Sequence, residues 1–233
     1  MFIVMELERV SLQSYFYKNV EENSNYKANL NERENFLKKI IRGAATALEQ
    51  FHKYAIHLDI KPDNFLISRT QNNEDYLINC KLIDFNTSVI TPYKRKTIQT
   101  YGSPFFMAPE IRTTYIHQVN KIIRNNINKK RKVTRKVDIW AFGLMIYDLL
   151  YLKTDYFHQL IEENANIYNI LDAEFVDYRL NAELNTDLDR GCIQLRLNKR
   201  PSIIAIKLFL YGECNGFEYE RNQLREDTNW CPK

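Results

Sequence analysis

The sequence has few cysteines and no long apolar run, and both features narrow the class of protein. Its four cysteines are scattered through 233 residues without a C-x-x-C pair. This favours reduced thiols over a zinc site or a disulfide framework. The most apolar segment, residues 139–152, contains Asp148 and is shorter than the roughly 20 residues that a bilayer-spanning helix needs. It is therefore expected to be a buried helix of a soluble protein.

A secretory leader and a strong charge imbalance are also missing. Residues 1–5 carry no basic leader and run directly into Glu6, so no secretory signal is expected. The scattered cysteines indicate a cytoplasmic or nuclear protein. The net charge of +4 is mild and does not favour nucleic acid as a partner. A hydrophobic content of 45% is ordinary for a globular protein, and the length fits one large domain with short appendages.

A tight loop at residues 57–67, His-Leu-Asp-Ile-Lys-Pro-Asp-Asn-Phe-Leu-Ile, concentrates side chains that suit phosphoryl chemistry. Asp59 can accept a proton from an attacking hydroxyl, and Lys61 can meet charge on a transferred phosphoryl group. Asn64 can offer a carbonyl oxygen to Mg²⁺. Because Lys-Pro-Asp-Asn is also good turn chemistry, a surface turn with mixed charges is the alternative.

Further motifs follow this loop in the chain. Asp84-Phe85-Asn86 comes at the end of a predicted strand, where its carboxylate could serve as a second magnesium ligand. The other motifs are Tyr-Gly-Ser-Pro-Phe-Phe-Met-Ala-Pro-Glu at 101–110, Asp-Ile-Trp-Ala-Phe-Gly at 138–143 and Asn-Lys-Arg-Pro-Ser at 198–202.

In this order the motifs resemble H-R-D-L-K-P-x-N, D-F-G, G-T-P-x-Y-M-A-P-E, D-x-W-S-x-G and K-R-P-S of eukaryotic Ser/Thr protein kinases. The resemblance extends from about residue 3 to about residue 210. Residues 64–67 and 81–85 are also loosely similar to the spindle-checkpoint kinases. The implied reaction is transfer of the ATP γ-phosphoryl group to Ser or Thr hydroxyls of a protein substrate, with Mg²⁺.

The resemblance implies a mainly α fold with a few short strands, namely the large C-terminal lobe of a kinase without the small N-terminal β lobe. Residues 1–10 would be the last small-lobe strand and the hinge, 11–210 the large lobe, and 211–233 a polar tail. No G-x-G-x-x-G loop, V-A-I-K lysine or partner glutamate occurs. The chain is thus expected to be either part of a longer kinase or a lobe kept for binding, and the top of the lobe to dock a small lobe or a partner.

The resemblance also assigns roles to individual residues. Asp59 would position the nucleophile, Lys61 would meet the phosphoryl charge, and Asn64 and Asp84 would hold Mg²⁺. The hydroxyl of Ser103 would brace Asp59 and Lys61. A pseudokinase-like lobe that only binds proteins is the alternative, but such lobes commonly lose one of the four catalytic and metal residues that are present here.

The remaining assignments concern nucleotide binding and structure. Met5 would be the gatekeeper, the backbone of Glu6 and Glu8 would meet adenine, and Leu66 would lie beneath it. Asp138 would accept hydrogen bonds from the catalytic-loop backbone, and Arg200 would form an ion pair with Glu110. The other residues expected to be structural are His57 and Phe85.

Two positions depart from the kinase pattern. Leu58 replaces the arginine that reads a phosphorylated activation segment, here residues 87–103, so activity is expected not to require that phosphorylation. Asn86 replaces the D-F-G glycine, and asparagine tolerates positive φ better than other residues do.

Apolar periodicity predicts helices at 12–20, 36–51 and 203–210, as well as the buried helix at 139–152. Asn31 and Glu34 are expected to cap the second helix. Strands are expected at 65–68 and 80–83 around a turn at 69–75, and loops at 21–29 and 86–109. Residues 121–136 contain eight Lys or Arg and no acid, which favours a solvated insert over a nuclear-localisation or acidic-partner segment.

Overall fold

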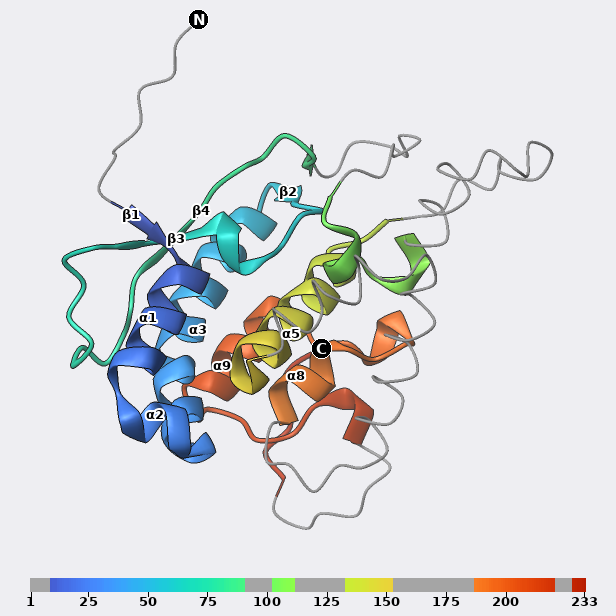
Figure 1. Ribbon diagram of the computed structural model, residues 1–233. Helices are drawn as coiled ribbons and strands as arrows, with labels where there is room; N and C mark the ends of the chain where they lie inside the picture. The colour runs from blue at the N-terminus through green and yellow to red at the C-terminus, as the bar shows by residue number, and fades with distance from the viewer. Residues whose placement is uncertain (1–8, 91–101, 112–132, 153–186, 221–227) are drawn as a thin grey trace, which may run out of the picture.

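The computed structural model describes residues 9–90, 102–111, 133–152, 187–220 and 228–233, and these residues are mainly helical (Figure 1). The predicted N-terminal strand and the hinge residues Met5, Glu6 and Glu8 lie outside the described residues. In chain order the helices and strands are β1 (Arg9–Ser11), α1 (Leu12–Glu22), α2 (Ser24–Ala28), α3 (Leu30–His52), β2 (Ala55–Ile56), β3 (Phe65–Ser68), β4 (Cys80–Leu82), β5 (Val89–Ile90), α5 (Lys136–Tyr151), α8 (Asp187–Cys192) and α9 (Ile203–Leu210).

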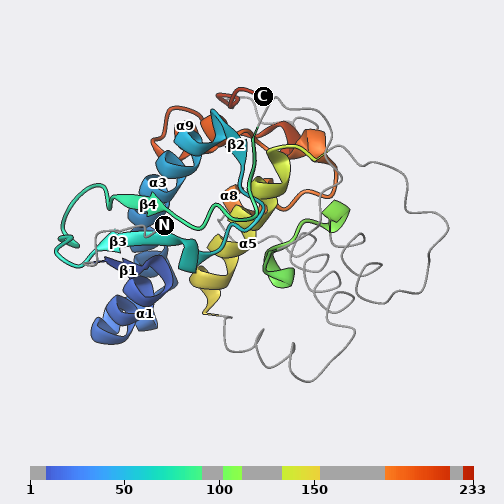
Figure 2. The same cartoon turned by 90° about the horizontal axis from the view of Figure 1, so that it is seen from above.

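Helix α5 lies at the centre of the helical layer. Every residue from Val137 to Leu150 is buried, including the large side chains of Trp140 and Phe142. The helix packs against α3 and α8, and α9 packs on α3 (Figures 1 and 2). Burying a large apolar side chain contributes roughly 1.5–3 kcal/mol, so a helix that is apolar on all sides is stable only in such a position. The prediction of a buried helix here is confirmed.

The N-terminal helices form where expected, but asparagine caps set their limits. Asn29 has an extended backbone, and its side-chain oxygen accepts hydrogen bonds from the amides of Asn31 and Glu32, so α3 begins at Leu30. The predicted capping pair of Asn31 and Glu34 is therefore wrong. Asn23 caps α2 in the same way, and the predicted loop at 21–29 instead contains this short helix and the end of α1.

The strands form two small antiparallel sheets. The order β1–β3–β4 makes one sheet, in which Leu66 pairs with Ser11 on one side and with Lys81 on the other. Strands β2 and β5 make the second sheet, although β5 falls in the predicted loop at 86–109. The turn between β3 and β4 approaches α3 closely at Gly43, where an added Cβ would lie 1.8 Å from the carbonyl oxygen of Ile78. Only glycine allows this contact.

The C-terminal residues correct the expectation about cysteine. Cys214 and Cys231 form a disulfide, whereas Cys80 and Cys192 are free thiols. Backbone pairing brings the two half-cystines together, because the amide of Cys231 donates to the carbonyl of Gly216 at 2.8 Å. The prediction of four reduced thiols is thus wrong for this pair, which is 17 residues apart and has no spacing signal.

None of the helices in the described residues combines the length and apolarity needed to cross a bilayer.

Candidate active site

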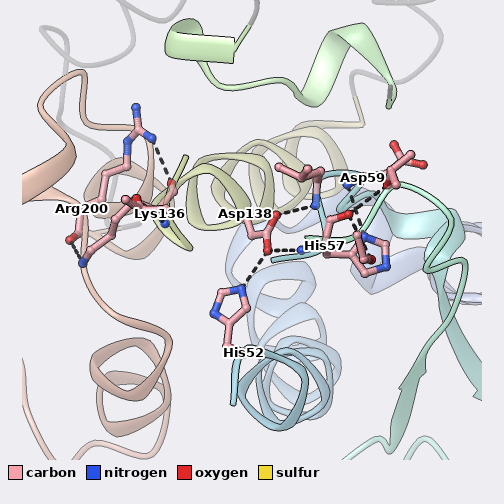
Figure 3. A network of polar contacts seen from close by, with 10 residues as sticks. His52, His57, Asp59, Lys136, Asp138 and Arg200 are labelled. Carbon is pink, nitrogen blue, oxygen red and sulfur yellow. Dashed lines mark hydrogen bonds and ion pairs between the residues drawn. The ribbon is translucent and has the colours of Figure 1, made fainter. Parts of the chain in front are cut away.

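The backbone of the loop at residues 57–64 is held by one buried carboxylate. Asp138 lies in the first turn of α5 and is 1% exposed. Its Oδ2 accepts from the amide of His57 at 2.8 Å, and its Oδ1 accepts from the amide of Leu58 at 2.9 Å (Figure 3). The helix dipole favours a negative charge at this end of α5. The observed contacts are those expected of Asp138.

A third partner of Asp138 was not predicted. The Nε2 atom of His52, at the end of α3, lies 2.9 Å from Asp138 Oδ2, and the histidine is buried (Figure 3). The sequence signal for this contact was a histidine at the buried end of an amphipathic helix, close to a loop that an aspartate holds.

The loop backbone is strained where Asp138 holds it. Leu58 has a φ of 70°, a left-handed conformation that costs a non-glycine residue roughly 1–3 kcal/mol. The carbonyl of Leu58 is approached by Gly102, where an added Cβ would lie 2.7 Å from that oxygen. Gly102 also has a φ of 139°, so glycine is required for two reasons. The start of the loop is therefore fixed from both sides.

Both carboxylate oxygens of Asp59 have partners. Oδ1 accepts from the backbone amide of Ser103 at 2.8 Å, and Oδ2 accepts from Asn64 Nδ2 at 3.1 Å. The ammonium of Lys61 lies 3.5 Å from Oδ2. The structure thus brings Ser103 to Asp59, as expected, but by its amide rather than by its hydroxyl. With 8% of its surface exposed, Asp59 is a nearly buried carboxylate in a fixed orientation.

Asn64 and Asp84 lie at the same end of the β3–β4 pair. The carbonyl of Asn64 accepts from the amide of Ile83 at 2.9 Å, which places Asp84 directly after this contact. Asp84 has a φ of 61°, and its Oδ1 accepts from Asn86 Nδ2 at 2.8 Å. Of these two residues, Asp84 has a positive φ and Asn86 does not. The expected positive φ at Asn86 is therefore not needed, and the asparagine instead holds the carboxylate.

His57 connects this strand end to the catalytic loop. Its Nε2 lies 2.9 Å from the carbonyl oxygen of Ile83, and its Nδ1 accepts from the amide of Asp59 at 3.3 Å. These partners fit a neutral ring with the proton on Nε2. The ring of Phe85 packs edge-on against His57 at 5.7 Å and stacks on Phe51 at 5.0 Å. Both predicted structural residues thus join α3, β4 and the loop.

The ion pair between Arg200 and Glu110 is present and bidentate. Arg200 Nη1 and Nη2 donate to the two Glu110 oxygens at 2.7 and 2.9 Å. The guanidinium also donates to the carbonyls of Gln194 and Lys136 and lies 4.9 Å from the centroid of the Trp140 ring. A buried arginine with this many partners has little uncompensated desolvation cost.

Lys136 corrects the prediction of a solvated basic insert at 121–136. It is the first residue of α5, and its ammonium donates to the carbonyl of Arg200 at 2.5 Å (Figure 3). Burial lowers the pKa of Lys136, with Arg200 as a further cause. Residues 121–132 lie outside the described residues.

The family described as protein kinase domain matches residues 1–208 of the chain. The chain belongs to the protein kinase family. Among its relatives, Serine/threonine-protein kinase ELM1 of Saccharomyces cerevisiae is 30% identical over 189 residues, which cover 74% of this chain and 26% of that protein. Calcium-dependent protein kinase 13 of Arabidopsis thaliana is 33% identical over 100 residues, covering 42% of this chain and 15% of the plant protein. The chain spans about a quarter or less of the length of these two relatives.

Members of the protein kinase family use ATP and Mg²⁺, and the described residues fit the metal. Both contacts of Asn64 Nδ2 are made to Asp59, which leaves the amide oxygen to act as a ligand. Within the described part of the chain, Asp84 Oδ2 has no hydrogen-bond partner. No group of three His, Cys, Asp or Glu in that part could hold a metal ion. Mg²⁺ is commonly bound through one or two protein carboxylates together with waters and substrate phosphates.

The other residues expected to contact the nucleotide are only partly described in this kinase chain. Leu66 lies in β3 as a half-buried residue, on the strand that follows Asn64. Of the predicted activation segment, residues 91–101 lie outside the described residues. Thr87 and Ser88 at its start both donate to the carbonyl of His57, which fixes the segment to the catalytic loop.

Proposed function

We propose that this chain is the catalytic lobe of a Ser/Thr protein kinase and transfers the ATP γ-phosphoryl group to protein hydroxyls. The geometry of Asp59 carries the proposal. Its carboxylate is oriented by Ser103 and Asn64 through both oxygens, and Lys61 lies beside it at 3.5 Å. A surface turn with mixed charges has no reason to bury and fix a carboxylate in this way.

In the proposed reaction Asp59 orients the substrate hydroxyl and accepts its proton as the oxygen attacks. Lys61 stabilises negative charge on the transferred group. Asn64 and Asp84 hold Mg²⁺, which when bound supplies charge neutralisation on the phosphates. Leu66 supplies apolar contact below adenine, while Met5, Glu6 and Glu8 are proposed as the gatekeeper and hinge contacts. The structural residues Asp138, His57 and Phe85 keep the loop and Asp84 in register.

The name Serine/threonine-protein kinase ELM1 supports the Ser/Thr class. A location in the cytoplasm or nucleus is proposed as well. The chain contains no G-x-G-x-x-G loop and no V-A-I-K lysine, which neutralise the nucleotide phosphates in the family. We therefore propose that residues 1–10 lead from a small lobe, which a longer chain or a partner supplies on top of residues 11–210.

The experiment that tests the proposal joins the chain to a small kinase lobe and measures radiolabel transfer from ATP to a mixed Ser/Thr protein substrate. Asp59→Asn should lower kcat about a hundredfold or more, because it removes both orientation and proton acceptance. Asp63→Asn is the matched control, since Asp63 is an exposed carboxylate of the same loop. Near-full transfer by Asp59→Asn would exclude the proposed role of Asp59. Absence of transfer by the folded, unaltered fusion would favour the binding-only lobe.

A further inference from the structure

A cavity of about 410 Å³ lies between the helices, away from the catalytic loop. Its apolar walls come from four helices and include Leu37 and Ile41 of α3, Ile146 and Leu150 of α5, and Leu188 of α8. Asp138, which anchors the catalytic loop, is 12 residues from Leu150 along α5, which corresponds to about 18 Å. The cavity is therefore at the opposite end of α5 from Asp59.

The volume and lining of this cavity suit a small organic molecule. Cavities of about 300–1,000 Å³ with mainly apolar walls and a few polar groups are typical ligand sites. The polar groups here gather along one face of α3, where Glu34, Lys38 and Arg42 follow at intervals of four residues. Glu34 and Lys38 neutralise each other in an ion pair of 2.7 Å.

Among the described residues, Arg42 is the cation of this cavity that has no acidic partner. Its Nε donates to the carbonyl of Leu210 at 3.0 Å, and its guanidinium lies 4.5 Å from the ring centroid of Tyr76 and 5.5 Å from that of Tyr211. Within the described residues its terminal nitrogens, Nη1 and Nη2, have no hydrogen-bond partner. The two rings and the carbonyl hold the guanidinium in place before any ligand arrives, which reduces the entropy lost on binding.

We infer that this cavity binds a small organic anion, whose apolar body fills the space between α3, α5 and α8 and whose carboxylate pairs with Arg42. A guanidinium with two free terminal nitrogens matches the geometry of a carboxylate, which accepts two parallel hydrogen bonds. The ion pair with Lys38 neutralises Glu34, the acidic residue that lines the cavity. The site is separate from phosphotransfer, and binding can be measured whether or not the chain is an active kinase.

The test is calorimetric titration of the full 233-residue chain with naphthoate and with naphthamide, its neutral counterpart of the same shape. Naphthoate should bind the unaltered chain more tightly. Arg42→Gln should weaken naphthoate about tenfold, the loss of one charge-assisted hydrogen bond, and should leave naphthamide unchanged. Lys53→Gln is the matched control, because it removes one positive charge from the exposed far end of the same helix and should change neither affinity.

A second pair of variants tests the location. Leu150→Trp should fill the cavity and abolish binding of both compounds, and Leu188→Phe does the same from another helix should the first variant fail to fold, as monitored by circular dichroism. The inference is overturned if naphthoate does not bind at millimolar concentration or binds no better than naphthamide. It is equally overturned if Arg42→Gln and Lys53→Gln weaken naphthoate alike, or if a folded cavity-filling variant still binds.

Discussion

Replacing Asp138 with asparagine should destabilise the fold and the catalytic loop together. The carboxylate accepts three hydrogen bonds, two from the amides of His57 and Leu58 and one from His52. An asparagine of the same shape has one acceptor oxygen and one NH₂ group. If the oxygen replaces Oδ2 and keeps His52 and His57, the NH₂ group faces the amide of Leu58, and two donors meet.

The expected size of the effect follows from these contacts. Losing one charge-assisted hydrogen bond costs about 1.5–3 kcal/mol, and leaving a buried amide without an acceptor costs about 1–3 kcal/mol. Both costs describe the same broken contact between residue 138 and the Leu58 amide, so they are not added in full. We expect the free energy of unfolding to fall by about 3 kcal/mol. The positive φ of Leu58 would also lose one of the contacts that stabilise it, so the loop should relax.

Urea unfolding followed by circular dichroism measures the stability change, and a phosphotransfer assay on the chain joined to a small lobe measures activity. Asp63→Asn removes the same charge from an exposed position and should change unfolding by less than about 0.5 kcal/mol. A double-mutant cycle with His52→Ala isolates the contact between His52 and Asp138. If Asp138→Asn unfolds with the stability of the unaltered chain, the carboxylate does not hold the loop and the reasoning is refuted.

Three further outcomes are expected. Burial first and then Asp75 raise the pKa of Tyr15 to about 12. The stability that neutral Tyr15 contributes below pH 10 should therefore be lost as the pH rises from about 10 to 12. Thermal unfolding at alkaline pH should show a smaller loss for Tyr15→Phe. Cys231→Ser, or reduction of the unaltered chain, should lower the free energy of unfolding by about 3 kcal/mol, because the disulfide joins cysteines 17 residues apart and closes the loop between them. An unchanged urea midpoint would contradict this. Leu58 cannot bind a phosphate on Thr97 or Thr100 of the predicted activation segment, so Thr97→Ala combined with Thr100→Ala should leave most of the phosphotransfer activity of the assembled kinase. A large loss of activity, together with activation of the unaltered protein by phosphorylation, would indicate that another cation binds the phosphate.

The long helices and the strands β3 and β4 could be predicted from the sequence, whereas the shortest elements could not. The apolar positions of α3 and α5 repeat over many turns, and their burial follows from that pattern. The strands β2 and β5 are two residues each and exist because distant segments pair. Helix α2 is short and polar, and its limits depend on asparagine side chains that serve equally well in loops.

For the candidate site, the sequence predicted which residues contact one another but not which of their atoms make the contact. The motifs predicted that Ser103 would contact Asp59, and it does. They did not predict that Ser103 would use its amide, because backbone contacts leave no mark on the choice of side chain. The disulfide was missed for a related reason, since backbone pairing of residues 215–216 with residues 229–231 brings the two cysteines together.

The contacts of Asp138 and Arg42 suggest how the two ends of the helical layer differ in use. At the N-terminal end of α5 the charges of Asp138, Arg200 and Glu110 are paired with protein groups, so these three residues support the backbone and not a ligand. At the other end Arg42 is held equally firmly, by a carbonyl and two aromatic rings, but its terminal nitrogens remain available among the described residues. A charge that is fixed but unpaired is suited to a ligand, whereas a charge that is fixed and paired is suited to support, and this difference separates the proposed anion site from the scaffold of the catalytic loop.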